Sequence, residues 1–460
     1  MNAVFALNPW ISELLSLGGA LALLVVLLLI GTALGRSLGV HQWGIPEALL
    51  AGTLGLLIAP GGQLLPLIPQ GVIGIWNQLP LILLTLVFGT LLVGKPLPKV
   101  NGLLRPLGAQ VLLALTLAFG QYLVAGLAVL LVLQPLLHVS PVMACLIEVA
   151  YEGGHGSAAA MGPTYERLGV EGGTGLGLAM ATVGLLASTL VGGLVVVIAR
   201  ARGWVMVPAA VASAGEGPSS AASQPTMPAT ELPWAQRLRT WTINLAFVGI
   251  AVAIGCGLMA LLQLLAARIG GSFAVVIDAL PVFPLALIGS LLVRLVLERC
   301  GAGELASPKV QSRIATVSAD LLIVAATACL DLGLLAQDWM PLSVLAVIGL
   351  LWNLTVVLFL GRTLPAPWFE RGILEFGQAT GVAASGLLLL NMADPGDQSN
   401  ALTPFSIKQL LLQPLLAGGV ITVMAPLAIA GWGLPVWTGV CLGLTVLWIV
   451  LAVVLQRQAA

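Results

Sequence analysis

The sequence predicts an all-α polytopic membrane protein: two inverted repeats of five transmembrane helices, each with a re-entrant loop, plus a C-terminal extra helix. The 460-residue chain is 59% hydrophobic and 8% charged, whereas soluble proteins have about 25% charged residues. Its apolar runs repeatedly reach the roughly 20 residues that cross a bilayer. Two apolar runs, one in each half, are interrupted by glycines and ionisable residues.

The apolar runs predict eleven spans and divide the chain into four regions. A first repeat occupies 1–202, a flexible linker 203–233, a second repeat 234–432 and an extra transmembrane helix 433–460. The linker is rich in Ala, Ser, Pro and Gly, a composition that cannot bury enough apolar surface to fold. The expected spans lie near residues 13–35, 46–65, 79–94, 107–133, 173–199, 241–266, 280–297, 314–336, 340–360, 406–430 and 435–456.

The interrupted segments, 141–163 and 372–393, are the most informative feature. In hydrocarbon, irregular backbone survives only where protein buries it or a water-filled cavity contacts it. One such segment in each half is typical of the binding site of a secondary transporter. We therefore expect a transporter rather than an enzyme, and no catalytic residues.

Basic residues favour re-entrant loops in both segments. With the N-terminus outside, all but Arg167 and Arg268 of the 18 Lys and Arg residues, Lys408 among them, then fall on the cytoplasmic side, as the positive-inside rule requires. If 141–163 were a full span, four arginines (Arg200, Arg202, Arg237 and Arg239) would face outward. The re-entrant arrangement makes the two repeats enter their loops from opposite membrane sides.

Other composition signals narrow the classes further. Zero net charge gives no reason to expect a nucleic-acid partner, and five scattered cysteines without CxxC spacing predict neither a disulfide framework nor a zinc site. The first apolar run lacks the basic region and cleavage site of a signal peptide, so we expect it to remain as a membrane helix. We expect a multi-pass protein of the inner (plasma) membrane, with the lipid bilayer as its surroundings.

Small and polar residues at the two loop tips are the candidate substrate contacts. Helix N-termini at such tips carry partial positive charge and suit carboxylates, and glycines let the backbone approach a ligand closely. The alternative is that these small residues only allow tight helix packing. The candidate substrate-binding residues are Gly153, Gly154, His155, Gly156, Ser157, Gly377, Gln378, Thr380, Gly381 and Ser385.

Four carboxylates in or beside apolar runs are the candidate cation-coupling residues: Glu148, Glu152, Asp320 and Glu375. A charge at mid-membrane costs roughly 2.5–3.5 kcal/mol on insertion scales, which favours a functional role. The alternative is an interfacial carboxylate at the membrane edge. Glu152 and Glu375 each precede a glycine by two residues, and we expect them to face one central cavity as equivalents.

The first segment carries a family resemblance. Gly153-Gly154-His155-Gly156-Ser157, followed by Pro163-Thr164-Tyr165-Glu166-Arg167-Leu168-Gly169, resembles the first signature of the sodium:glutamate symporter (glutamate:Na⁺ symporter) family. Gly35-Arg36 and Ile45-Pro46-Glu47 with Ala51-Gly52 resemble the family's start, and Leu280-Pro281-Val282-Phe283 with Gly289 resembles the mirrored position. The agreement covers about residues 20 to 430.

The resemblance implies a homodimeric, sodium-coupled symporter of L-glutamate or a related small acid, with inverted repeats and elevator-like movement. It implies Na⁺ as the coupling ion and no other cofactor. The chain departs from the family pattern at Glu152, where a small residue is expected, and at Gln378, where histidine is expected. Two carboxylates beside the site would repel an acidic substrate unless protonated or neutralised by sodium. The alternative is therefore a sodium- or proton-coupled transporter of a neutral polar solute or another organic anion.

A membrane-embedded metalloenzyme is a remote alternative. Glu152-x-x-His155 has the Glu-x-x-His spacing of di-iron helix bundles, which need that motif twice. The second half offers only Glu375-x-x-Gln378, and the Gly153-Gly154 pair disfavours the helix that would align the ligands. We expect no metal site beyond Na⁺.

Overall fold

The protein is all-helical throughout the residues that the computed structural model describes: 9–39, 47–60, 67–94, 104–206, 234–271, 280–330, 332–363, 366–394 and 398–457, with Ala274 and Ile277. Within them, eight helices are long and apolar enough to cross a membrane. This confirms the predicted class, a polytopic membrane protein. The eight lie at Leu17–Leu38, Gln70–Thr90, Arg105–Leu137, Gly173–Ala201, Trp234–Ile269, Pro308–Ala328, Trp339–Thr363 and Leu434–Leu455.

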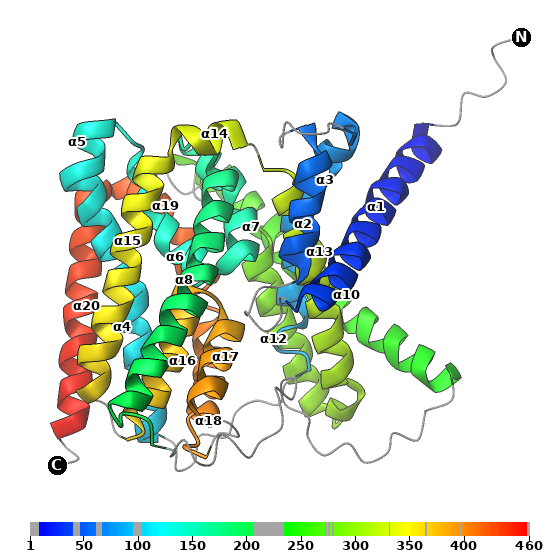
Figure 1. The fold of residues 1–460 in the computed structure, drawn as a ribbon. Helices are drawn as coiled ribbons and strands as arrows, with labels where there is room; N and C mark the ends of the chain where they lie inside the picture. The colour runs from blue at the N-terminus through cyan, green and yellow to red at the C-terminus, as the bar shows by residue number, and fades with distance from the viewer. Residues whose placement is uncertain are drawn as a thin grey trace, which may run out of the picture.

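The helices pack as two bundles that lie side by side (Figure 1). The first bundle takes three helices from each half of the chain. In the helix that begins at Pro308, the Ser307 side chain caps the start by accepting a hydrogen bond from the Val310 N–H. Pro308 occupies the first turn, where proline is favoured. Its members are α1 (Pro9–Leu38), α2 (Glu47–Ile58), α3 (Gln70–Thr90), α10 (Trp234–Ile269), α12 (Phe283–Arg299) and α13 (Pro308–Ala328).

The second bundle contains the remaining helices and all the interrupted segments. Its members from the first half are α4 (Leu104–Ala128), which continues through a widened turn into α5 (Gln134–Leu137), then α6 (Leu146–Tyr151), α7 (Gly154–Arg167) and α8 (Gly173–Ala201). Those from the second half are α14 (Leu332–Gln337), α15 (Trp339–Thr355), α16 (Trp368–Thr380), α17 (Ala383–Ala393), α18 (Leu402–Leu412), α19 (Val420–Trp432) and α20 (Leu434–Arg457).

The bundles meet chiefly through α7, which packs against α3 and α13. Small residues allow close helix crossings within each bundle. A Cβ atom on Gly289 would lie 2.0 Å from the Ala251 carbonyl oxygen, and one on Gly120 would lie 1.9 Å from the Trp352 ring. Close approach through small residues is the usual way in which membrane helices gain packing contacts. Large apolar side chains such as Leu190, Val197 and Leu264 face outward instead, as a lipid surrounding requires.

Four expected spans differ in the structure. The one at 314–336 is interrupted after Ala328, where α13 ends, and is followed by the separate α14. The helix in 46–65 stops at Ile58, shortly before Pro60, and α12 has 17 residues. A helix rises 1.5 Å per residue, so both fall short of the roughly 20 residues that span a bilayer. The expected single span at 406–430 is wrong, because it is divided into α18 and α19.

Two sequence assignments change in the structure. Most of the 203–233 linker lies outside the described residues, but Trp204 packs against Trp368 and the Met206 N–H donates to the Glu370 carboxylate at 2.6 Å. The start of the linker is therefore packed against α16.

Lys408, which was counted among the cytoplasmic charges, is instead buried within the protein.

Candidate functional site

The first interruption lies between α6 and α7. α6 ends at Tyr151, Glu152 and Gly153 form a turn, and α7 starts at Gly154. Gly154 has a φ of 67°, which residues with a side chain adopt only with strain. The glycine therefore lets the chain leave one helix and enter the next within a few residues, inside the predicted segment 141–163.

The second interruption lies between α16 and α17. α16 ends at Thr380, and α17 starts directly after Gly381 and Val382. The two helices pack along each other as a hairpin. A Cβ atom on Gly377 would lie 2.5 Å from the Gly386 Cα atom, so the pair of glycines permits this close approach. Gly377 thus serves packing, whereas Gly381 lies at the interruption.

The two interruptions meet within the second bundle. A Cβ atom on Gly154 would lie 2.6 Å from Cγ1 of Val382, which places the start of α7 against the start of α17. Neither start has a side-chain capping hydrogen bond. The first N–H groups of a helix lack intrahelical partners and carry partial positive charge. Two helix starts from opposite halves therefore direct N–H groups towards one region.

α8 runs past both interruptions. A Cβ atom on Gly184 would lie 2.4 Å from the Thr380 carbonyl oxygen and 2.6 Å from the Tyr151 ring. Nearby, His155 Nε2 lies 3.0 Å from the Thr182 hydroxyl. The absence of a side chain at Gly184 is therefore what lets α8 contact the ends of α6 and α16 together.

Ser385, a predicted substrate contact, is buried at the second interruption, and its hydroxyl has no hydrogen-bond partner among the described residues. A Cβ atom on Gly381 would lie 2.8 Å from the Ser385 hydroxyl and 2.4 Å from that of Ser188 on α8. The structure therefore places two hydroxyl groups directly against Gly381.

A third interruption, between α18 and α19, was missed by the sequence analysis. Ala417 and Gly418 have φ values of 55° and 94°, conformations outside a right-handed helix. The local signal was present in Pro414 and the Gly418-Gly419 pair, because proline removes a helical donor and glycine tolerates positive φ. The apolar length of 406–430 outweighed this signal.

Glu148 connects the first interruption to the third. Its buried carboxylate accepts hydrogen bonds from the Tyr122 hydroxyl at 2.6 Å, the Thr422 hydroxyl at 2.8 Å and the Ala417 N–H at 3.2 Å. The Ser157 hydroxyl donates to the Ala417 carbonyl at 3.3 Å. Both oxygens of Glu148 are therefore occupied by donors from other elements.

Glu375 is half of a buried ion pair. Its two carboxylate oxygens lie 2.8 and 2.9 Å from Lys408 Nζ, and both side chains are 1% exposed. Gln110 Nε2 also donates to Glu375, at 2.7 Å, and Lys408 donates to Gln409 Oε1 at 3.0 Å. Gln378, a predicted substrate contact, accepts from Gln409 Nε2 at 2.8 Å. These contacts fasten α18 to α16.

Glu152 differs from Glu375 in both position and partners. Glu152 lies in the turn between α6 and α7 and is 6% exposed. Its Oε2 atom has no hydrogen-bond partner among the described residues. It lies close enough to Glu148, Glu375 and Lys408 for electrostatic interaction with each. Because Glu375 lies inside α16, well before Gly381, the expected equivalence of Glu152 and Glu375 is wrong. Glu148, also inside a helix before its interruption, is the closer counterpart of Glu375.

Asp320 does not join this cluster. It lies on α13 in the first bundle, half-buried, and its electrostatic neighbours are Glu47 and Arg313. The structure therefore brings together three of the four predicted cation-coupling carboxylates.

Two amides that sequence reasoning missed complete the end of α16. Gln121 Nε2 and Asn353 Nδ2 donate to the Ala379 carbonyl at 2.7 and 2.9 Å. Asn353 also donates to the Thr380 hydroxyl oxygen at 3.0 Å. In the sequence, each of these residues stands out only as a polar amide within a long apolar run.

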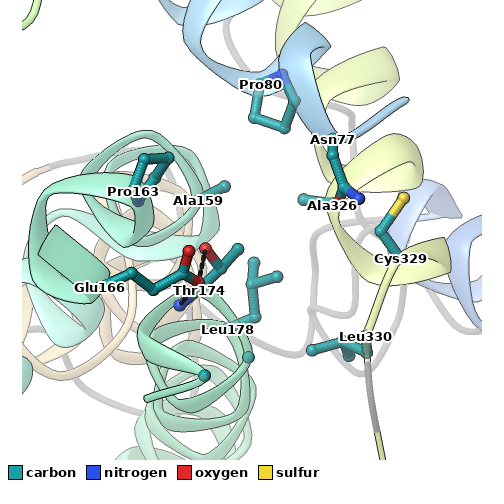
Figure 2. Close-up of a pocket in the computed structure, with 12 residues that line it drawn as sticks. Asn77, Pro80, Ala159, Pro163, Glu166, Thr174, Leu178, Ala326, Cys329 and Leu330 are labelled. Carbon is teal, nitrogen blue, oxygen red and sulfur yellow. Dashed lines mark hydrogen bonds between the residues drawn. The ribbon is translucent and has the colours of Figure 1, made fainter. Parts of the chain in front are cut away.

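A pocket of about 330 Å³ opens between the bundles, lined by α3, α7, α8 and α13 (Figure 2). Its polar lining includes Asn77 of α3 and Glu166 of α7, which accepts hydrogen bonds from the Thr174 N–H and hydroxyl at 3.4 and 3.0 Å. Cys329 contributes a thiol opposite Glu166.

Apolar side chains of the first bundle pack against the start of α7. A Cβ atom on Gly156 would lie 3.4 Å from Leu84 of α3 and 3.8 Å from Leu322 of α13. Both leucines are buried. They therefore pack at the start of α7, whereas the pocket lies along its later turns.

The Glu152-x-x-His155 spacing does not form a metal centre in the described part of the chain. No group of three or more His, Cys, Asp or Glu side chains arranged to hold a metal ion occurs there. Glu152 lies in the turn, and the His155 ring contacts Thr182.

Comparison with known proteins gives no assignment. No protein-family model matches the chain, and no curated protein is significantly similar to it. Membership of the sodium:glutamate symporter family therefore stays a prediction that rests on the residues quoted above.

The contact between the two interruptions predicts a specific loss of stability. Gly154→Ala introduces left-handed backbone strain of about 1–2 kcal/mol and an overlap with Val382 that costs about 1–3 kcal/mol. Gly169 is the matched control, because it has a φ of 86° and open space around its Cβ position. Thermal unfolding of the purified protein should rank wild type above Gly169→Ala, and Gly169→Ala above Gly154→Ala.

Removing the contacted side chain supplies the second half of this test. Val382→Ala should recover about 0.5 kcal/mol or more of the loss in a Gly154→Ala background, because residues in contact show non-additive effects. Strict additivity of the two substitutions would contradict the contact between α7 and α17.

Proposed function

We propose that this chain is a secondary active transporter that binds its solute where the two interruptions meet. The observation that carries the proposal is the juxtaposition of two helix starts, at Gly154 and Ala383, without side-chain caps. The first N–H groups of a helix lack intrahelical partners, so such a pair suits a ligand that accepts hydrogen bonds from them. Paired discontinuous helices of this kind form the sites of known transporter folds.

The chemistry of these ends supports coupled binding of a carboxylate and a cation. Helix starts favour anionic groups, and helix ends, with nearby carboxylates, favour cations. α6 ends at Tyr151 beside Glu152, so both kinds of group occur together. The proposal is sodium-coupled symport of L-glutamate or a related small acid, the class implied by the family resemblance.

A neutral polar solute is the second candidate, and Glu152 favours it. Its partner-free carboxylate oxygen lies beside the interruption, where a second negative charge would be repelled. A solute without net charge, carried with sodium or a proton, avoids that repulsion.

Uptake into proteoliposomes tests the proposal. Purified protein should accumulate at least one member of a panel of amino acids, sugars and organic acids when a sodium or proton gradient is imposed. Excess unlabelled glutamate should compete if an acid is the substrate and leave uptake unchanged if it is not. Protein-free vesicles are the control, and no gradient-driven uptake of any panel member would sink the idea.

An inverted repeat is part of the same proposal. Each half gives three helices to the first bundle, then a long helix (α4 or α15) and an interrupted pair (α6 and α7, or α16 and α17) to the second. Re-entrant interrupted pairs account for the distribution of basic residues, although Lys408 no longer counts towards it because it is buried.

Thiol labelling of the 203–233 linker tests this topology. Ser219→Cys, in a background with the exposed Cys256 and Cys300 and the pocket-lining Cys329 replaced, should stay unlabelled by an impermeant reagent added to intact cells. It should react once the cells are permeabilised. Strong labelling from outside would contradict the cytoplasmic linker and the inverted arrangement.

The pocket between the bundles suits an access route, because it runs along α7, whose start forms the site. Leu84 and Leu322 pack at Gly156, in the first turn of α7. Alternating access would then move α7 relative to α3 and α13. A homodimer with elevator-like movement is the arrangement that the resemblance implies; light scattering of the solubilised protein measures its subunit number.

Cys329 reports on this route. Modification of its thiol by a bulky reagent, in a background that lacks Cys256 and Cys300 but keeps Cys329, should lower uptake several-fold because the adduct fills the pocket. The Cys329→Ala variant is the control and should be insensitive to the reagent. Full uptake by completely modified protein would exclude the pocket as an access route.

A further inference from the structure

The three buried carboxylates around the interruptions have different partners. Glu148 accepts hydrogen bonds from neutral donors, and Glu375 is paired with the ammonium group of Lys408. The Oε2 atom of Glu152 has neither kind of partner among the described residues. Burying an ionised carboxylate without a partner is costly enough that it is normally paired or neutralised. The contrast among the three therefore bears on where a mobile cation binds.

The Lys408 ammonium group contacts three oxygen atoms within the protein. An ammonium group has three N–H donors and no acceptor. The structure supplies three acceptors at 2.8, 2.9 and 3.0 Å: the two oxygens of Glu375 and Oε1 of Gln409. The Phe405 ring lies 4.5 Å from Nζ, a further favourable contact for a cation. This environment is a complete cation-binding site, and its cation is covalently attached to α18.

Glu152 has no equivalent tethered cation. Among the described residues that interact with it electrostatically, Lys408 is positive and already bound by Glu375, whereas Glu148 and Glu375 share its negative sign. Glu152 also follows directly on the end of α6, and helix ends favour cations. A small monovalent cation at Glu152 would supply the missing partner.

We propose that Lys408 is a tethered cation that permanently fills the carboxylate site of the second interruption, leaving Glu152 to bind a single mobile cation, Na⁺ or H⁺. The single-cation stoichiometry for coupling rests on the proposed transport function. The cation site itself does not, because binding at Glu152 is measurable without any solute.

Cation binding to purified, solubilised protein tests the proposal. Melting temperature is measured against NaCl concentration at constant ionic strength with choline chloride, and against pH in choline chloride alone. A ligand that binds only the folded state raises the melting temperature in a saturable way. Wild type should show a one-site response to Na⁺, or, if the cation is a proton, a response to pH without one to Na⁺. Absence of both responses overturns the proposal.

Two single variants separate the roles of the charges. Glu152→Gln should abolish the response or raise the half-saturating concentration about ten-fold or more, the equivalent of one strong interaction. Lys408→Met, which leaves Glu375 unpaired, should add a second Na⁺ or proton site. A full wild-type response in Glu152→Gln, or a one-site response in Lys408→Met, overturns the assignment.

Two further variants guard against misfolding and general charge effects. Combined Glu375→Gln and Lys408→Met removes both buried charges and should retain the one-site response at Glu152; its loss would contradict the proposal. Glu47→Gln, in the first bundle and paired with Arg36, should behave as wild type. In the pH arm, the neighbouring titratable groups are Glu148, His155, Glu375 and Lys408, so the change must follow the Glu152 variant to count. Intact cation binding without gradient-driven uptake would reject the transport proposal alone.

Discussion

A helix that stops inside a membrane exposes backbone donors and acceptors that lipid cannot satisfy, and this constraint organises the second bundle. At some interruptions, side chains of the protein form hydrogen bonds with the free backbone groups. Gln121 and Asn353 satisfy the end of α16, and Glu148 satisfies the Ala417 N–H in the third interruption. The starts of α7 and α17 lack such side-chain caps. These two starts differ from the other interruptions in lying against each other, which is the feature on which the proposed site rests.

The same polar contacts determine which helices belong together. Glu148 joins α6 to α19 through Thr422, and Glu375 joins α16 to α18 through Lys408. Separating either pair would strand a buried charge or donor in an apolar surrounding, which is costly. The contact of α7 with α3 and α13 contains apolar side chains and a pocket instead. Separating the bundles would therefore leave fewer buried polar groups without partners than rearranging the helices of the second one.

The sequence predicted those features that have local signals. Apolar length indicated the membrane class, and glycines with ionisable residues marked both principal interruptions. Lys408 could not be placed, because its pairing with Glu375 depends on α18 packing against α16 rather than on any spacing along the chain. The expected equivalence of Glu152 and Glu375 was wrong because it was based on their spacing along the chain, two residues before a glycine in each case. Gly377 serves helix packing, whereas the chain leaves the helix at Gly381.

The buried ion pair has a consequence for how this protein can change over generations. Losing one member of a buried pair costs about 3–5 kcal/mol, whereas replacing both by apolar residues is often neutral. Because natural proteins are only marginally stable, a single substitution at either Glu375 or Lys408 removes much of the available margin. Descendants of this sequence should therefore keep both residues or change both, so that positions 375 and 408 vary together.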